Sequence, residues 1–211
     1  NMLVCRFTGE DFPPLEKIHE GLAPNYYYLS KELLKLGVET LLISGGYPRY
    51  PRYEVLDEGI RVYRLRTRPA ALKAASAPIL NEWASAIISR NPGIDVFNVH
   101  NFFGIWLEKK LRIPKVMTAH GTDIGWYMDN EQLPLRYGTR AVMDRIEIEL
   151  AIRMFRDSCR YADRIITVSK KVKDEIVDYF REPEEKVSVV YNGVDHSVFY
   201  PKKVGSLSSA Y

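Results

Sequence analysis

Short apolar runs rich in Val, Ile and Leu alternate with longer segments of helical periodicity along almost the whole chain. The apolar runs, each short enough for one buried strand, cover residues 2–7, 38–43, 59–65, 94–99, 113–119, 162–168 and 186–190. Strands that alternate with helices form βαβ units with right-handed crossovers. The sequence therefore predicts an α/β fold, with a doubly wound, mostly parallel Rossmann-like sheet that is flanked by helices on both faces.

The spacing of apolar residues predicts which faces of the helices are buried. Between Pro24 and Gly37, apolar residues recur three and four positions apart and predict one buried face. That face would consist of Tyr26, Leu29, Leu33 and Leu36. The segment 136–161 carries two stripes, Val142, Ile146, Leu150 and Met154, and Ile148, Ile152, Phe155 and Cys159. Two stripes predict burial on more than one side. The run 59–65 alternates apolar residues with Arg, which is typical of an edge strand.

Composition and charge narrow the class of protein. The chain has 211 residues, of which 46% are hydrophobic and 27% charged, as in a soluble globular domain. No apolar run reaches the roughly 18 residues that span a bilayer, and residues 1–7 read as a strand rather than a signal peptide. A net charge of +3 is too small to indicate a nucleic-acid partner. Cys5 and Cys159 are expected to be buried free thiols of a cytoplasmic protein.

Arg and Tyr residues are interleaved between positions 47 and 68. A charge run of this kind is usually a solvated edge of a sheet. The alternative is a surface for an anion or a sugar-lipid, at the periphery of a membrane, to which Arg64 and Arg66 would contribute. Both interpretations stay open at the level of sequence.

Polar side chains follow two of the predicted strands at the points where these strands end. His100 and Asn101 follow the first of them, and His120, Gly121, Thr122 and Asp123 follow the second. The loops after parallel strands share one edge of a doubly wound sheet, and ligands bind at that edge. Two imidazoles that converge there, beside a carboxylate and a glycine, predict a site for a polar ligand.

Each candidate residue also has a purely structural explanation. His120 could satisfy a loop carbonyl, and Gly21 could ease entry into the first helix rather than admit an anion to its backbone N–H groups. The histidines and Asp123 lack H-x-H or H-E-x-x-H spacing and a third firm ligand, so no metal is expected. The chain contains no G-x-G-x-x-G, P-loop or G-x-S-x-G motif.

Four segments in order carry a family resemblance. Glu20-Gly21-Leu22 and the helix and strand that follow are similar to a glycine loop, helix and L-x-x-x-G-H-E-V strand. Residues 118–123 look like T-x-H-G-x-D, and residues 162–169 look like A-D-x-I-x-x-V-S. Residues 186–201 are similar to K-V-x-V-I-x-N-G-V-D-x-x-x-F-x-P. Together these segments resemble the N-terminal domain of retaining GT-B glycosyltransferases of family 4, the group 1 enzymes.

The resemblance implies a division of the chain. Residues 1–198 would form the acceptor-side Rossmann-like domain, the N-terminal half of a GT-B fold, and residues 199–211 a hinge or tail. A C-terminal domain, absent from this sequence, would bind most of the nucleotide-sugar donor. The acceptor would be a saccharide or a lipid-linked group. No metal or other cofactor and no nucleic-acid partner are implied.

The resemblance also assigns roles. His120 would face the donor sugar and act with Asp123 in catalysis, whereas Gly21, with Glu20 beside it, would lie next to the donor diphosphate. Glu20 stands where the family often has the first Gly of a pair. The sugar and acceptor pocket would be lined by His100, Asn101, Gly121 and Thr122. Two other functions stay open, namely a sugar-nucleotide epimerase with the same fold and a non-catalytic carbohydrate- or lipid-binding module.

Overall fold

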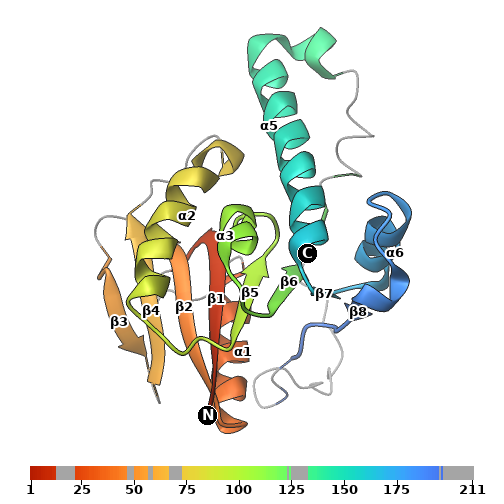
Figure 1. Cartoon of the computed structure of the whole chain (residues 1–211). Coiled ribbons are helices and arrows are strands. Elements are labelled where there is room, and N and C mark those ends of the chain that lie inside the picture. Colours follow the sequence, from red (N-terminus) through yellow and green to blue (C-terminus); the bar gives the residue numbers. More distant parts are fainter. Residues whose placement is uncertain are drawn as a thin grey trace, which may run out of the picture.

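The computed structural model describes residues 1–12, 22–46, 50–56, 59–66, 73–122, 124, 133–194 and 196. Strands in this part of the chain form one sheet in the order β3-β4-β2-β1-β5-β6-β7-β8 (Figure 1). Their bounds are β1 Met2–Asp11, β2 Val38–Gly46, β3 Tyr53–Leu56, β4 Ile60–Arg66, β5 Val96–His100, β6 Lys115–Ala119, β7 Arg164–Thr167 and β8 Val187–Val189. Neighbouring strands are parallel except for the pair β3 and β4. The predicted α/β class is therefore confirmed.

Helices cover both faces of the sheet. Their bounds are α1 Ala23–Lys35, α2 Lys73–Ser89, α3 Ile105–Lys110, α5 Leu133–Tyr161 and α6 Lys170–Asp178, with a 3-10 turn η3 at Glu184–Lys186. In Figure 1, α2 and α3 lie in front of the sheet and α1 lies behind it. Because side chains of a strand alternate between faces, Cys5 and Phe7 of β1 join the core under α2 and α3, whereas Arg6 between them bonds to α1. A smaller core lies under α1 and includes Leu42.

The run 59–65 was predicted to be an edge strand, and that prediction is wrong. The strand β3 pairs antiparallel with β4 and lies outside it. Gly59, whose φ is +110°, provides left-handed backbone at the return between the two strands. The strand β3 has only four residues and directly follows Pro51 and Arg52. This run is too short for its alternation of side chains to be recognised as a strand in the sequence.

Arg64 of β4 is buried and bonds to Glu54 of β3, so it is not exposed on a charged surface. Only 4% of the residue is accessible, and its Nη2 lies 2.7 Å from Glu54 Oε2. Its Nε donates a hydrogen bond to the carbonyl oxygen of Phe12 at 2.6 Å. An arginine engaged in this way cannot contact a membrane or an acceptor. The surface interpretation therefore does not hold for Arg64.

The buried face of α1 differs from the predicted apolar stripe. Leu29 and Leu36 are 42% and 78% exposed, whereas Tyr26 and Ser30 are fully buried. The reason is a polar contact with the sheet: the side chain of Arg6 on β1 donates to both Tyr26 and Ser30. An apolar-periodicity argument cannot detect a helix face that binds a buried cation.

The predicted second buried side of the long helix α5 is also wrong for its N-terminal half. Val142, Ile146 and Leu150 are 43%, 54% and 39% exposed, whereas Phe155 and Cys159 are buried. Figure 1 shows that the N-terminal half of α5 projects past the end of the sheet. Only the C-terminal half therefore reaches the core.

Two further expectations concern the cysteines and the membrane. Cys5 and Cys159 are free and buried, as predicted. Burial raises the pKa of the Cys5 thiol to about 12, so it is unreactive at neutral pH. In the described part of the chain, no helix is both long and apolar enough to cross a membrane.

Leu41 tests the assignment of the core between the sheet and α2. Leu41 on β2 is fully buried, so Leu41→Ala leaves a cavity and should lower the free energy of unfolding by about 2–5 kcal/mol. The matched control is Leu36→Ala, at a leucine that is 78% exposed. We expect the control to change stability by less than about 0.5 kcal/mol in urea denaturation. Similar losses for the two variants would contradict this assignment.

Candidate functional site

The polar side chains that follow the strands gather at the carboxyl edge of the sheet, at its topological switch point. The strand β1 is bordered by β2 on one side and by β5 on the other, so the chain winds outward from it in both directions. His100 ends β5, and His120 directly follows β6. Ligands of doubly wound sheets bind at this kind of position.

The two histidine side chains contact each other directly. His100 Nδ1 lies 2.8 Å from His120 Nε2, and the two rings are nearly coplanar, at 12°. Tyr26 of α1 packs edge-on against both rings, with centroid distances of 4.6 Å to His100 and 6.0 Å to His120. His100 is 1% exposed, whereas His120 is half-buried. His120 is therefore the member of the pair that reaches the surface of the edge.

A buried arginine holds the inner histidine. Arg6 Nη2 lies 3.3 Å from His100 Nε2, and Arg6 Nη1 donates to Tyr26 O and to Ser30 Oγ, both at 2.8 Å. Arg6 is 1% exposed, and burial lowers the pKa of its guanidinium to about 10. It therefore remains a cation at neutral pH. Among the described residues, the hydrogen-bond partners of Arg6 are uncharged groups.

Burial and the nearby cation keep both imidazoles neutral. Burial, followed by Arg6 and then by His120, holds the pKa of His100 well below its usual range. Burial, followed by Arg6, lowers the pKa of His120 to about 4. At neutral pH each ring thus carries a single N–H. The pair can orient a polar ligand by hydrogen bonding but does not supply a positive charge.

Asn101 holds together the two backbone segments that carry the histidines. Its φ of 54° is left-handed, a conformation that Asn tolerates better than most residues. Its amide N–H donates to Thr118 O at 2.9 Å, and its Oδ1 accepts a hydrogen bond from the His120 amide at 3.1 Å. Asn101 thereby ties the end of β5 to the loop after β6, which explains why a short polar residue stands there.

The other sequence candidates differ in where they lie. Gly121 is exposed, and a Cβ added there would meet no atom within 4 Å, so no close packing requires glycine at that position. The Thr122 hydroxyl donates to Glu175 of α6, which ties the loop to that helix. Glu20, Gly21 and Asp123 lie outside the described residues. The structure therefore brings together His100, Asn101 and His120 and directs the Thr122 side chain elsewhere.

Sequence reasoning missed three residues that build this site, namely Arg6, Tyr26 and Ser30. One signal was present: Arg6 stands in the middle of the apolar run Leu3-Val4-Cys5-Arg6-Phe7. A charge at the centre of a strand with two buried faces needs partners inside the protein. Ser30, four residues after Tyr26 on one face of α1, is the other half of that pattern.

A second polar cluster lies behind Asn101. Glu108 of α3 is 2% exposed, and its Oε2 lies 2.5 Å from Ser158 Oγ of α5, which also lies 3.3 Å from Asn101 O. Burial raises the pKa of Glu108 to about 8, against the opposing effects of the Ser158 hydrogen bond and of Lys115 and Lys186. The protonated carboxyl can then donate to Ser158, whose own hydroxyl hydrogen is left for the Asn101 carbonyl.

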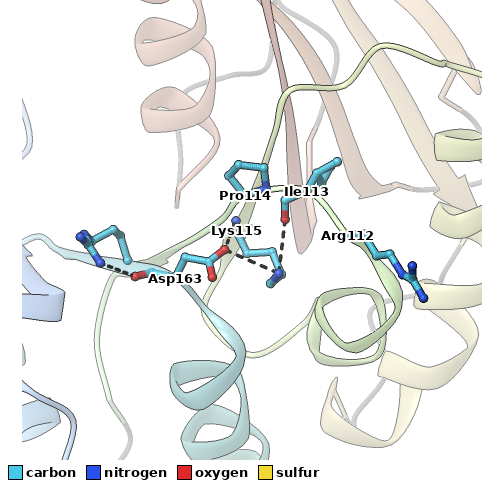
Figure 2. Close-up of a pocket in the computed structure, with 6 residues that line it drawn as sticks. Arg112, Ile113, Pro114, Lys115 and Asp163 are labelled. Carbon is cyan, nitrogen blue, oxygen red and sulfur yellow. Dashed lines mark hydrogen bonds and ion pairs between the residues drawn. The ribbon is translucent and has the colours of Figure 1, made fainter.

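An open depression lies at the opposite edge of the sheet (Figure 2). It is lined by residues around the starts of β6 and β7, namely Arg112, Ile113, Pro114, Lys115, Asp163 and Arg164. Lys115 is held there by Asp163, whose Oδ2 accepts from the Lys115 amide at 2.8 Å and lies 3.5 Å from its Nζ. Since the histidines lie at the carboxyl edge, this depression is not part of their site.

The doubly wound fold agrees with that of GT-B glycosyltransferases, and the comparison with family models identifies the family. The family model described as Glycosyltransferase Family 4 matches residues 21–198. The chain belongs to glycosyltransferase family 4.

Individual relatives agree with this assignment. An uncharacterised glycosyltransferase of Methanocaldococcus jannaschii is 31% identical over 208 residues, which cover 92% of this chain and 47% of that protein. Sucrose-phosphate synthase from Thermosynechococcus elongatus has a similar fold, with a TM-score of 0.74 at 15% identity over 96% of this chain and 51% of its own. A UDP-N-acetylglucosamine 2-epimerase has a TM-score of 0.53 at 14% identity, over 90% of this chain and 48% of its own. The two structural likenesses show the fold alone, and the chain spans about half the length of each of these proteins.

Glu108 predicts a specific dependence of stability on pH. The folded state keeps a proton up to a pKa of about 8, whereas the unfolded state releases it above its ordinary pKa of 4.5. The free energy of unfolding should therefore fall as pH rises between these values, by up to about 1.4 kcal/mol per pH unit. Glu108→Gln removes this titration, so the stability of the variant minus that of the wild type should increase with pH in that interval. Urea denaturation over the interval measures the difference. The same substitution at exposed Glu82 is the control, and a pH-independent difference for Glu108→Gln would refute the assignment.

Proposed function

We propose that this chain is the acceptor-side domain of a retaining glycosyltransferase, which moves a sugar from a nucleotide donor to a saccharide or lipid-linked acceptor. Family membership supports glycosyl transfer, and the position of His120 at the carboxyl edge carries the assignment of the site. A second domain of the full-length protein would bind most of the donor. The finding that this chain spans about half of its relatives is consistent with that division.

His120 would face the donor sugar across the cleft between the two domains. Retaining transfer develops positive charge on the sugar and negative charge on the leaving diphosphate, so polar groups fixed beforehand around the reacting carbon lower the barrier. A neutral imidazole held by Asn101, Tyr26 and His100 is such a group. Asp123 and the exposed Gly121 would complete the wall of the sugar pocket.

The start of α1 would receive the diphosphate. Its N-cap residue, Leu22, makes no side-chain capping hydrogen bond, so the first backbone N–H groups are not satisfied in that way. Such groups bind anions, and Gly21, with Glu20 before it, would let the diphosphate approach. Asn25 Nδ2 donates to Asn192 Oδ1 at 2.9 Å, which ties the first turn of α1 to the segment after β8. In this proposal the segment after β8, which leads towards the second domain, would pass beside the bound diphosphate.

We further propose that the transfer uses no resident metal and takes place in the cytoplasm, at the edge of a membrane where the acceptor is lipid-linked. An epimerase of similar fold would also bind a sugar nucleotide but would need no acceptor. The family model and the glycosyltransferase relative favour transfer over epimerisation and over a non-catalytic module.

The role of His120 is tested in the full-length protein. His120→Ala should lower kcat/KM for glycosyl transfer by about 10²–10³-fold, the loss typical for one oriented hydrogen-bond donor at a reacting centre. Glu82→Ala is the control, because Glu82 is exposed on α2 and does not belong to the site. Transfer by His120→Ala at the wild-type rate would remove His120 from the mechanism.

The division of labour between domains is tested by calorimetry. The 211-residue chain alone should bind nucleoside diphosphates only weakly, above the micromolar range, because most contacts to the donor would come from the other domain. The full-length protein should bind them in or below that range. Micromolar binding by the isolated chain would contradict the proposed division.

A further inference from the structure

The contact between Arg6 and His100 has only one possible polarity. A guanidinium donates hydrogen bonds and accepts none. Since Arg6 Nη2 lies 3.3 Å from His100 Nε2, this nitrogen must be the acceptor and carries no proton. His100 is neutral, so its one hydrogen lies on Nδ1. Arg6 thereby selects the tautomer of His100.

The same reasoning extends to His120. His100 Nδ1 carries a proton and lies 2.8 Å from His120 Nε2, so His120 Nε2 must accept. His120 is also neutral at pH 7, so its hydrogen is left on Nδ1. Its Nδ1 is buried and has no hydrogen-bond partner in the described part of the chain. The hydrogen-bonded series Arg6, His100 and His120, here called the relay, therefore ends in an N–H donor at His120 Nδ1.

We propose that Arg6 is a positioning residue which, through His100, fixes His120 as the Nδ1–H tautomer and so makes it a hydrogen-bond donor towards the ligand. The inference rests on the proposed function only in naming that ligand as a sugar oxygen. Reversal of the relay would set His100 Nε2–H against a guanidinium N–H inside the protein, where neither group could reach water. The buried cation thus determines the direction of every hydrogen bond beyond it.

This arrangement limits what His120 can do. Its Nε2 lone pair is occupied by His100, and its Nδ1 carries the proton, so it has no free lone pair to take a proton from an acceptor hydroxyl. His120 serves as a donor and not as a general base. Any base in the transfer must come from another group. The donor would meet a hydroxyl or ether oxygen of the sugar.

The tautomers are measured directly by NMR on the protein labelled with ¹⁵N at histidine. Protonated and unprotonated ring nitrogens of a neutral imidazole have well-separated ¹⁵N resonances, and couplings to the ring hydrogens identify each nitrogen. We expect His120 Nδ1 and His100 Nδ1 in the protonated range and both Nε2 atoms in the unprotonated range. A protonated Nε2 on either ring in the wild type would overturn the proposal without any variant.

Arg6→Met tests whether the arginine is the cause. Without the guanidinium the relay can run in either direction, so the His120 Nδ1 resonance should shift towards the unprotonated range. Ser30→Ala is the control, because it removes one acceptor of Arg6 and leaves the contact between Arg6 and His100 in place. Arg6→Lys replaces the guanidinium with an ammonium, which also donates hydrogen bonds and accepts none, so it should retain the wild-type tautomers. This variant is measured in place of Arg6→Met if Arg6→Met does not fold. An unshifted resonance in folded Arg6→Met, or the same shift in Ser30→Ala, would refute the role of Arg6.

The outcomes separate this inference from the proposed function. Wild-type tautomers as expected, with full transfer by His120→Ala, would leave the relay in place and reject the sugar-facing role. A protonated His120 Nε2, with transfer lost in His120→Ala, would reject the relay and retain that role.

Discussion

The buried guanidinium of Arg6 is the interaction on which the edge of the sheet depends. A cation without access to water needs hydrogen-bond partners inside the protein, and the two Nη atoms of Arg6 find them in a helix carbonyl, a serine hydroxyl and an imidazole nitrogen. These partners come from α1, which packs on one face of the sheet, and from β5, the strand next to β1. One strand residue thus holds both the helix α1 and the His100 ring at the ligand edge.

The hydrogen bonds beyond Arg6 transmit that constraint outward. His100 holds His120, Asn101 holds the His120 backbone, and the Glu108 and Ser158 pair lies behind Asn101. Each step uses groups whose protonation is set by burial rather than by solvent. The polar groups at the ligand edge are therefore already oriented before a ligand binds. Groups oriented in advance stabilise a developing charge most effectively.

Much of this architecture could be predicted from sequence, and the exceptions share one cause. Strand periodicity and strand–helix alternation correctly predicted the parallel sheet, and the positions of His100 and His120 followed from strand ends. The misplaced stripes on α1 and α5 arose because apolar spacing reports amphipathicity and not the actual neighbour: Ser30 is buried and bonds to Arg6, whereas Ile146 is 54% exposed. The contact between Arg6 and His100 joins residues 94 positions apart, which no local pattern can indicate.

That separation has a consequence for biosynthesis. Arg6 leaves the ribosome before its partner on β5, which follows only after α1, β2, β3, β4 and α2 have been made. Until β5 pairs with β1, the guanidinium lacks its contact with His100. A nascent chain that has reached only β4 therefore lacks the contact between Arg6 and His100 and the ligand edge that this contact supports.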